Sequence, residues 1–266
     1  MALADGNIKI ALSELTPEWL KTNYLTGLKF VDYAQKEYPD SLFETHMQNA
    51  VAKIEKLCDI CILPLTVNAE QHDYRITDYQ NWGFLHLYKV PVRWVSALRG
   101  VYPAGTSVVQ YPTEAIQIRG DTGQLNLVPT SGALGSLIIG QGGTFVPLVY
   151  GQLSEVPNLW EVDYQAGMDV KDLPRMIVEA IAKLACMDLL AIFSDLSRPI
   201  GVTSESVAVD GLSQSQSYQI PAFQARIQRY EADLYGPAGK NQQLAMTQGL
   251  LKQILDAYRP LNLESL

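Results

Sequence analysis

Two cysteines, Cys58 and Cys61, come closest to a spacing that could support metal or redox chemistry. Three residues apart on a helix, they would share a face and could bind a soft metal ion, but a closed zinc site needs four ligands. The one other cysteine and the three histidines form no second paired motif. A redox pair is expected at the start of a helix, where the dipole lowers the thiol pKa, and this pair falls at the predicted end of one. We therefore interpret both thiols as core residues and expect no metal and no cofactor.

The motifs for nucleophilic catalysis and for phosphate binding are incomplete. The segment Gly211-Leu-Ser213-Gln-Ser215 lacks the second glycine of the G-x-S-x-G elbow and does not lead from a strand into a helix. The glycines from Gly132 to Gly143 are not followed by the lysine of a P-loop and open no predicted helix. Turns between short strands explain them. The sequence leaves open a serine triad assembled from distant residues.

Two acidic side chains and one histidine are the remaining candidates for acid–base chemistry. Glu161 and Asp163 lie two apart on a predicted strand, hence on one face, and we interpret them as like charges on a solvated face. His86 alternates with Leu85 and Leu87, which predicts a solvated or rim position. The residues therefore favour a protein that is not an enzyme.

The composition is that of a folded protein with an acidic balance. Of the 266 residues, 47% are hydrophobic and 18% charged, and the formal net charge is −8. Tight, sequence-independent binding to nucleic acid needs clustered Lys and Arg, and no such cluster occurs. The charge argues against a module that grips DNA and allows a wall that DNA slides past. We expect no signal peptide, no membrane span and, with three cysteines, no disulfide framework.

Helical signals stand at both ends of the chain. Thr16 and Pro17 predict the start of a short helix, because the threonine can cap free N–H groups and proline loses no hydrogen bond at the first helical position. Ser41 and Glu44 have the spacing of a capping box, ahead of an apolar helical pattern that Pro64 stops.

Helical periodicity returns after Gly167. A long helix is expected from about Leu173 to Leu196, a second over 223–235 and a last one near 244–258, beyond the glycine- and proline-containing segment 236–239. The stretch 202–220 between the first two reads as a polar, serine- and glutamine-rich loop. The last helix resembles a docking arm that lays an apolar stripe into a partner's groove, and folding back on its own core is the alternative.

The middle of the chain, from about His72 to Gln165, has a period of two. The clearest hairpin joins 115–119 to 124–127, with Ile116, Ile118, Leu125 and Leu127 on one face. Further short strands are expected at 136–139, 145–149 and 159–164, which predicts a small antiparallel sandwich or barrel.

The order of helices, strands and helices predicts an α+β fold, because alternating βαβ units are missing. We expect a helical core domain from 1–70 and 166–235, a β-rich insertion over 71–165, and a C-terminal hinge, helix and tail over 236–266.

Taken in order, these pieces resemble the head–tail adaptor (connector, or head-completion) proteins of tailed bacteriophages. The β segment is longer than a minimal adaptor needs, and the chain continues past the last core helix. The matching segments are Thr16–Lys21, Ser41–Ala50 with Ile54-Glu55, Val90-Pro91-Val92 before Trp94-Val95, Val162–Gly167, Leu173-Pro174 with Ala180-Ile181 and Leu184-Ala185, Ser204–Val207 and Asp210–Ser213.

The resemblance implies a structural virion protein located in the neck, and in the host cytoplasm during assembly. Such proteins form a closed homo-oligomeric ring of about twelve copies under the portal protein, joining the capsid to the tail, and DNA passes the lumen during ejection without sequence-specific binding. A tail-completion or tail-tube protein would be the partner on the other side.

Two sets of surface residues would then carry the function, and we expect no catalytic, metal-binding or cofactor-binding residue. The inter-subunit set is Arg175, Glu179, Lys183, Ser204, Ser206, Asp210 and Ser213. The portal set is Leu250, Leu251, Ile254, Tyr258, Leu261, Leu263 and Leu266. The alternatives are another neck or tail-completion protein, a carbohydrate hydrolase using the β region, and a carbohydrate- or protein-binding β module.

Overall fold

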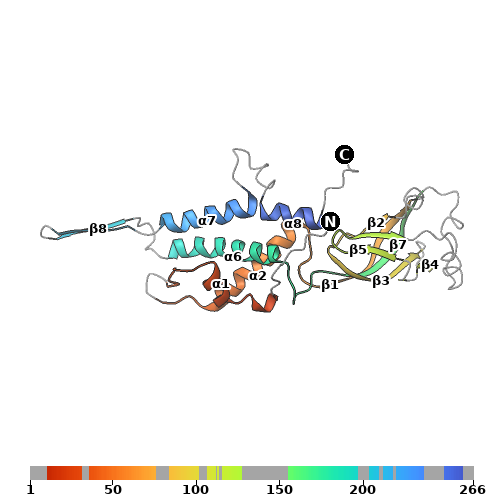
Figure 1. The fold of residues 1–266 in the computed structure, drawn as a ribbon, viewed down its shortest axis with the longest axis horizontal. Coiled ribbons are helices and arrows are strands. Elements are labelled where there is room, and N and C mark those ends of the chain that lie inside the picture. The colour runs from red at the N-terminus through yellow and green to blue at the C-terminus, as the bar shows by residue number, and fades with distance from the viewer. Residues whose placement is uncertain are drawn as a thin grey trace. The chain divides into compact units, whose positions relative to one another are not determined.

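The computed structural model describes residues 11–31, 36–75, 84–101, 107–111, 113, 116–127, 155–196, 204–209, 212–217, 220–236 and 249–259. The fold is α+β, with α-helices and antiparallel sheets (Figure 1). The chain forms two compact units, each made of segments that are distant in sequence. The first unit is Met1–Cys58 with Lys171–Asp256, and the second is Asp59–Val170 with Ala257–Leu266. The expected three-part division at 71–165 and 236–266 stays a prediction.

The helical unit begins as its sequence predicts. After a short 3-10 turn, Leu12–Glu14, helix α1 covers Pro17–Asn23. The Thr16 hydroxyl accepts a hydrogen bond from the Trp19 N–H at 3.2 Å, which satisfies one of the free N–H groups of the first turn. Pro17 occupies the first helical position, where its missing N–H costs nothing.

Helix α2 covers Asp40–Cys58, so both of its predicted ends were wrong. It starts one residue before Ser41, whose carbonyl accepts from the Thr45 hydroxyl at 2.8 Å inside the first turn. It stops well before Pro64, because Asp59 adopts a left-handed conformation with φ of 49°, which short polar side chains tolerate at helix ends. Cys61 therefore lies beyond the helix and does not share a helical face with Cys58.

Helix α6, Arg175–Leu196, is the central element of the helical unit. It packs against both α2 and α7, Ile220–Tyr235, and is therefore buried on more than one side (Figure 1). Its alanines allow this close packing on opposite faces, since they add little bulk. Its buried residues include Ile177, Val178, Ala180, Ile181, Ala182, Leu184, Ala185, Cys186, Leu189, Leu190 and Phe193.

The second unit contains two antiparallel sheets. The four-stranded sheet has the order β1 (Leu65–Arg75), β7 (Glu155–Ala166), β3 (Val92–Val101) and β4 (Ser107–Tyr111). The three-stranded sheet has the order β2 (Phe84–His86), β6 (Gln124–Leu127) and β5 (Ile116–Arg119). The β region thus begins at Leu65, earlier than the sequence indicated.

The hairpin expected at 115–119 and 124–127 is confirmed as β5 and β6. Ile118 lies opposite Leu125 and Ile116 opposite Leu127, so these four residues share a face as expected. His86 is exposed at the end of β2, also as expected. The strands expected at 136–139 and 145–149 lie outside the described residues.

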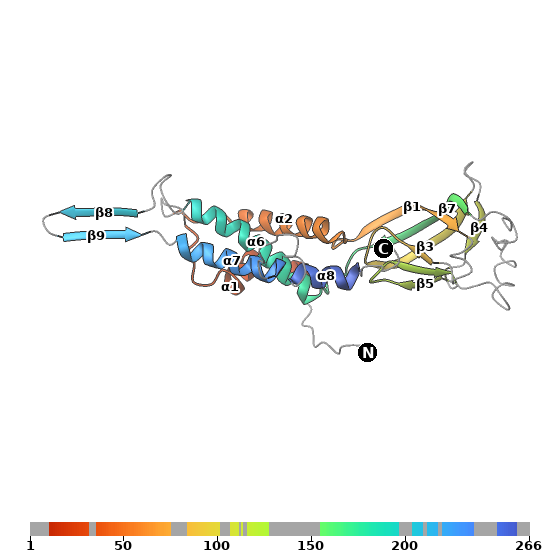
Figure 2. The ribbon, with the colours of Figure 1, turned by 90° about the horizontal axis from the view of Figure 1, so that it is seen from above.

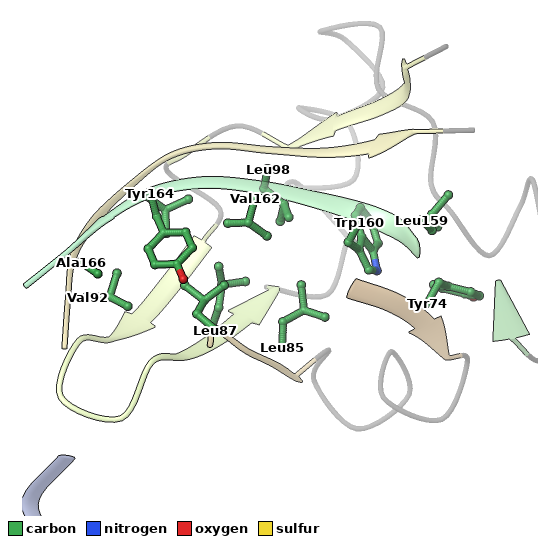
Figure 3. Close-up of a cluster of buried hydrophobic side chains, with 12 residues drawn as sticks. Tyr74, Leu85, Leu87, Val92, Leu98, Leu159, Trp160, Val162, Tyr164 and Ala166 are labelled. Atoms are coloured by element: carbon green, nitrogen blue, oxygen red, sulfur yellow. The ribbon is translucent and has the colours of Figure 1, made fainter. Parts of the chain in front are cut away.

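Both sheets contribute to a single apolar core (Figure 3). β7 supplies Trp160, Val162, Tyr164 and Ala166 to it, at the period of two that a strand buried on one face requires. The other members are one further β7 residue, Leu159, and residues of β1, β2, β3, β6 and the segment after β2. They are Tyr74, Leu85, Leu87, Val92, Val95, Leu98, Leu125 and Leu159.

The β7 strand ends at a glycine that no other residue can replace without strain. Gly167 has φ of 108°, and a Cβ at this position would stand 2.4 Å from the Leu63 carbonyl oxygen. The Gly167 N–H donates to the Pro91 carbonyl at 2.8 Å, and the Met168 N–H to the Ile62 carbonyl at 3.1 Å. The close approach fixes the end of β7 against the segments that precede β1 and β3.

Two tryptophans provide a matched test of this core. Trp160→Ala is expected to lower the free energy of unfolding of the β unit by about 3–5 kcal/mol, because the ring is 2% exposed and its removal leaves a cavity. Trp94→Ala, the control, removes a ring that is 50% exposed and should cost less than about 1 kcal/mol. Urea unfolding followed by circular dichroism measures both, and equal losses would contradict the assignment of this core.

Candidate assembly site

The inter-subunit residues predicted on α6 differ in how far they are exposed to solvent. Lys183 is buried, and its Nζ contacts Glu179 Oε1 at 2.7 Å and Asp233 Oδ2 of α7 at 2.9 Å. Burial alone would lower the pKa of Lys183, but its hydrogen bonds to the two carboxylates outweigh burial and raise it. Lys183 thus joins α6 to α7 inside one chain. Arg175 is exposed and Glu179 half-buried, so these two can still contact a neighbour.

The stretch 202–220, expected as a loop, contains a β-hairpin. β8 covers Ser204–Val209 and β9 covers Leu212–Ser217, and the two strands run antiparallel (Figure 2). The residues between them are Asp210 and Gly211, a pair that strongly favours a two-residue hairpin turn. The Asp-Gly pair was the signal in the sequence that could have predicted this hairpin, but the polar composition of the stretch was interpreted as a loop. Of the predicted contacts, Ser204, Ser206 and Ser213 lie in these strands, whereas Asp210 lies outside the described residues.

The register of the hairpin separates its residues into two different faces. Ser204 pairs with Ser217, Ser206 with Ser215 and Ala208 with Ser213, and strand alternation places all six positions on one face. The opposite face carries the positions of Glu205, Val207, Val209, Leu212, Gln214 and Gln216. Within the described residues, β8 pairs with β9 alone, so the hairpin is a two-stranded sheet.

The predicted portal residues divide at α8, Leu250–Tyr258. Leu251 and Ile254 are buried in the chain's own core, and the Cys58 thiol approaches the Leu251 carbonyl at 4.0 Å. At these two residues, the helix packs against its own chain, which is the alternative to a docking arm given above. Leu250 and Tyr258 are partly exposed, and a portal contact there stays a prediction. Leu261, Leu263 and Leu266 lie outside the described residues.

Arg259, which follows α8 and belongs to the second unit, makes three contacts within that unit. The Arg259 guanidinium donates to the Asp59 carbonyl at 3.2 Å, forms an ion pair with the Asp59 carboxylate at 2.9 Å and donates to the Tyr88 carbonyl. These contacts fix the position of Arg259 beside Asp59 and Tyr88.

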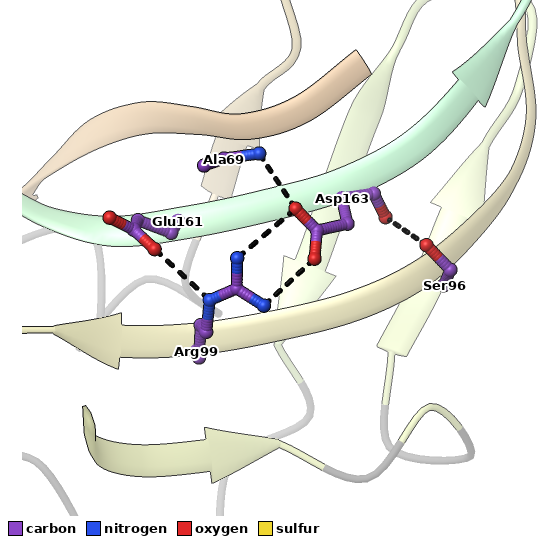
Figure 4. A network of polar contacts seen from close by, with 5 residues as sticks. All are labelled: Ala69, Ser96, Arg99, Glu161 and Asp163. Carbon is purple, nitrogen blue, oxygen red and sulfur yellow. Dashed lines mark hydrogen bonds and ion pairs between the residues drawn. The ribbon is translucent and has the colours of Figure 1, made fainter. Parts of the chain in front are cut away.

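The paired carboxylates on β7 are neutralised by an arginine on β3 (Figure 4). Arg99 Nε donates to Glu161 at 3.0 Å, and its two terminal nitrogens donate to Asp163 at 2.8 and 3.3 Å. Asp163 also accepts the Ala69 N–H at 2.6 Å, where β1 has an irregular register. The sequence predicted like charges on a solvated face; the two carboxylates do share a face, but they are half-buried and paired with Arg99, which strand pairing brings opposite Glu161.

A second polar cluster, Glu70, His72 and Tyr164, is buried in the β unit. Glu70 accepts from the Tyr164 hydroxyl at 2.5 Å and from the Tyr88 N–H at 2.9 Å, and its other contact is His72 Nε2 at 2.8 Å. Burial would raise the pKa of Glu70, but these hydrogen bonds outweigh burial and lower it. Because the acceptors are occupied by donors of the chain itself, the cluster fixes strand β1 to its neighbours.

Cys58 and Cys186 are buried core thiols, whereas the expectation that Cys61 is also buried was wrong. Burial raises the pKa of Cys58 to about 11 and also raises that of Cys186, so both stay protonated at neutral pH. Cys61 is half-buried. Among the residues that the structure describes, no group of three or more His, Cys, Asp or Glu could hold a metal ion, and no helix has the length and apolar character of a membrane span.

Comparison with known proteins gives matches among solved structures alone: no family model matches, and no curated protein does. A chain in the virion of a native gene transfer agent (GTA) particle is 18% identical with a TM-score of 0.38, over 85% of this chain and 93% of that one. A chain in the neck of an empty GTA particle, computed with C6 symmetry, is 16% identical with a TM-score of 0.37, over 85% and 93%. A chain in the neck of a native GTA particle, computed with C12 symmetry, is 15% identical with a TM-score of 0.35, over 86% and 94%.

The buried Glu70 gives a pH-dependent prediction. Its pKa is lower in the folded chain than the ordinary value of about 4.3, so its stabilising contribution is complete above that value and is lost as the pH falls through the folded-state pKa. Glu70→Gln should therefore lower the free energy of unfolding by about 1.5–3 kcal/mol at pH 7, and the difference from the parent chain should shrink below about pH 4.

The control is Glu44→Gln, which changes an exposed glutamate on α2. Urea unfolding at a series of pH values measures all three proteins. A difference for Glu70→Gln that stays constant from pH 7 to pH 3 would show that the carboxylate charge is not what stabilises the cluster.

Proposed function

We propose that this chain is a structural subunit that forms a closed ring in the neck of a tailed, phage-like particle, where it acts as a head–tail adaptor beneath the portal. The observation that carries the proposal is the β8–β9 hairpin inserted between α6 and α7, which pairs with no other described strand. A two-stranded hairpin is marginal by itself in water. Pairing with strands of other copies would stabilise such a hairpin.

The chemistry of the described residues also supports a structural role. In each cluster that could have performed acid–base chemistry, the polar groups are paired within the cluster. Arg99 neutralises Glu161 and Asp163, and Glu70 accepts hydrogen bonds from Tyr164 and Tyr88. The two buried thiols are held protonated by burial. What the described residues offer to a partner is therefore surface rather than reactive groups.

The charge also suits a ring through which DNA passes. The chain carries 20 Lys and Arg against 28 Asp and Glu, and several of its cations are engaged by its own carboxylates. A wall with clustered cations would hold phosphates by counterion release, whereas an acidic wall lets the duplex slide. DNA in the lumen would therefore be a passenger and not a ligand.

The portal contact is proposed for the C-terminal segment that follows Arg259, together with the exposed parts of Leu250 and Tyr258. Arg259 is held by Asp59 and Tyr88, and the sequence that follows it contains three leucines among polar residues. Leu251 and Ile254 are excluded from the proposed contact because they are buried, so their removal would unfold α8 before it revealed anything about a partner.

The ring is tested by mixing the purified chain with its portal protein. Mass photometry and negative-stain imaging should show closed rings of uniform copy number attached to one end of the portal. Arg175→Glu is expected to weaken ring formation at least tenfold, because this exposed position on α6 is a proposed neighbour contact. A matched charge reversal on the exposed face of α1, Glu18→Lys, is the control. A chain that stays monomeric with portal at every concentration would overturn the proposal.

The portal contact is tested separately. Changing Leu261, Leu263 and Leu266 together to serine should abolish copurification with portal while the melting temperature stays within about 2 °C of the parent chain. Changing Asn262, Glu264 and Ser265 together to alanine, the control, keeps the length and the leucines and should keep binding. If the serine variant still copurifies with portal, this segment is not the contact; copurification with a tail component instead would favour the tail-completion alternative.

A further inference from the structure

We propose that the β8–β9 hairpin pairs edge to edge with the same hairpin of the neighbouring copy, so that β9 of one chain lies beside β8 of the next and the ring is closed by a continuous antiparallel sheet. This inference deepens the proposed function and rests on it. Its occupant is a second copy of this chain.

The first observation is that each hairpin strand has an unused edge. The ladder joins six residue pairs between β8 and β9 without a register shift, and within the described residues neither strand pairs with anything else. Each strand therefore has a second row of backbone N–H and C=O groups on its outer edge, at regular spacing and without a bulge. Such an edge is a template for another strand.

The second observation is that this edge lacks the devices that protect the other sheet. β1, at the edge of the four-stranded sheet, has register shifts between Val67 and Glu70 and between His72 and Tyr74, and ends at Arg75. Bulges and charges of this kind discourage edge-to-edge pairing. β8 and β9 contain no lysine, arginine or proline, and their one charged residue is Glu205. The chain thus blocks one edge and leaves the hairpin open.

The third observation concerns which partner fits. The two strands are equal in length, six residues each, so the β9 edge of one copy matches the β8 edge of another along its whole length. β9 has no charged residue, so no register of this pairing brings Glu205 opposite a like charge. A foreign strand would cover one edge and leave the other open, whereas head-to-tail pairing of copies uses both edges in every chain.

Rotational symmetry makes the pairing antiparallel throughout. When copies are related by rotation about an axis roughly along the strands, every β8 runs one way and every β9 the other. Each β9 then meets a β8 that runs opposite to it, as the strands do within one hairpin. A head-to-tail contact that closes in this way leaves no edge. The resulting wall contains no cation, which suits the passage of DNA.

The test uses serine-to-cysteine changes, which the hairpin offers on both strands. Ser204→Cys and Ser206→Cys on β8 are made in separate chains from Ser213→Cys, Ser215→Cys and Ser217→Cys on β9, all in a Cys61→Ser background because Cys58 and Cys186 are buried. Each β8 variant is mixed with each β9 variant, assembled with portal and oxidised. Ring formation is measured independently by mass photometry and negative-stain imaging.

Disulfide-linked dimers are expected in at least one mixture that contains a β8 and a β9 variant, and in none of the five variants assembled alone. Links within a single variant would show like-strand pairing, and links to portal would show that the portal covers the edge; either result overturns the inference. Rings without any link also overturn it and leave the proposed function standing. If no rings form, the proposed function fails and this inference fails with it.

A second variant tests the same edge without oxidation. Ser206→Lys adds a charge of the kind that blocks edge pairing and should reduce ring formation at least tenfold, while helical thermal unfolding stays unchanged. Gln48→Lys, at an exposed position of α2, carries the same charge change and should leave rings intact. Normal ring formation by Ser206→Lys would count against the hairpin contact.

Discussion

Backbone N–H and C=O groups need partners, and this requirement decides which elements of the chain are central. β7 pairs with β1 along one edge and with β3 along the other, and its alternation places apolar side chains in the core and carboxylates on the opposite face. α6 satisfies its own backbone and packs against α2 and α7. In the described part of the chain, the β8–β9 hairpin is the sheet in which every strand has one edge left over.

Local signals in the sequence were sufficient where a single interaction decides the structure. Thr16 caps α1 because the hydroxyl of a threonine just before a helix can accept from the N–H three residues on, and this spacing is visible in the sequence. The β5–β6 register follows from the alternation of four apolar residues. The end of α2 was not predictable in the same way, because Asp59 stops it through a left-handed conformation that aspartate adopts only in some contexts.

The sequence predicted the candidate site less well, since two quite different environments can have the same pattern. An apolar stripe on α8 predicts a buried face but does not show whether the chain itself or a partner buries it. In the structure, Leu251 and Ile254 are buried within their own chain. Lys183 looked like a surface charge because nothing local shows that Asp233, fifty residues away, lies beside it. Arg99 and Glu161 likewise meet through strand pairing, which is a non-local contact.

The composition of the hairpin shows how an open edge can be tolerated by a single copy and still be used in an assembly. Serine and glutamine dominate its positions, so the edge of a lone chain is hydrated and its pairing with another edge is weak. A strand as apolar as β7 in the same place would pair with any exposed strand and aggregate. When copies dock around a portal, their local concentration rises and many weak edge contacts act together, because closing the ring makes the last ones intramolecular. Polar edges therefore couple sheet formation to docking.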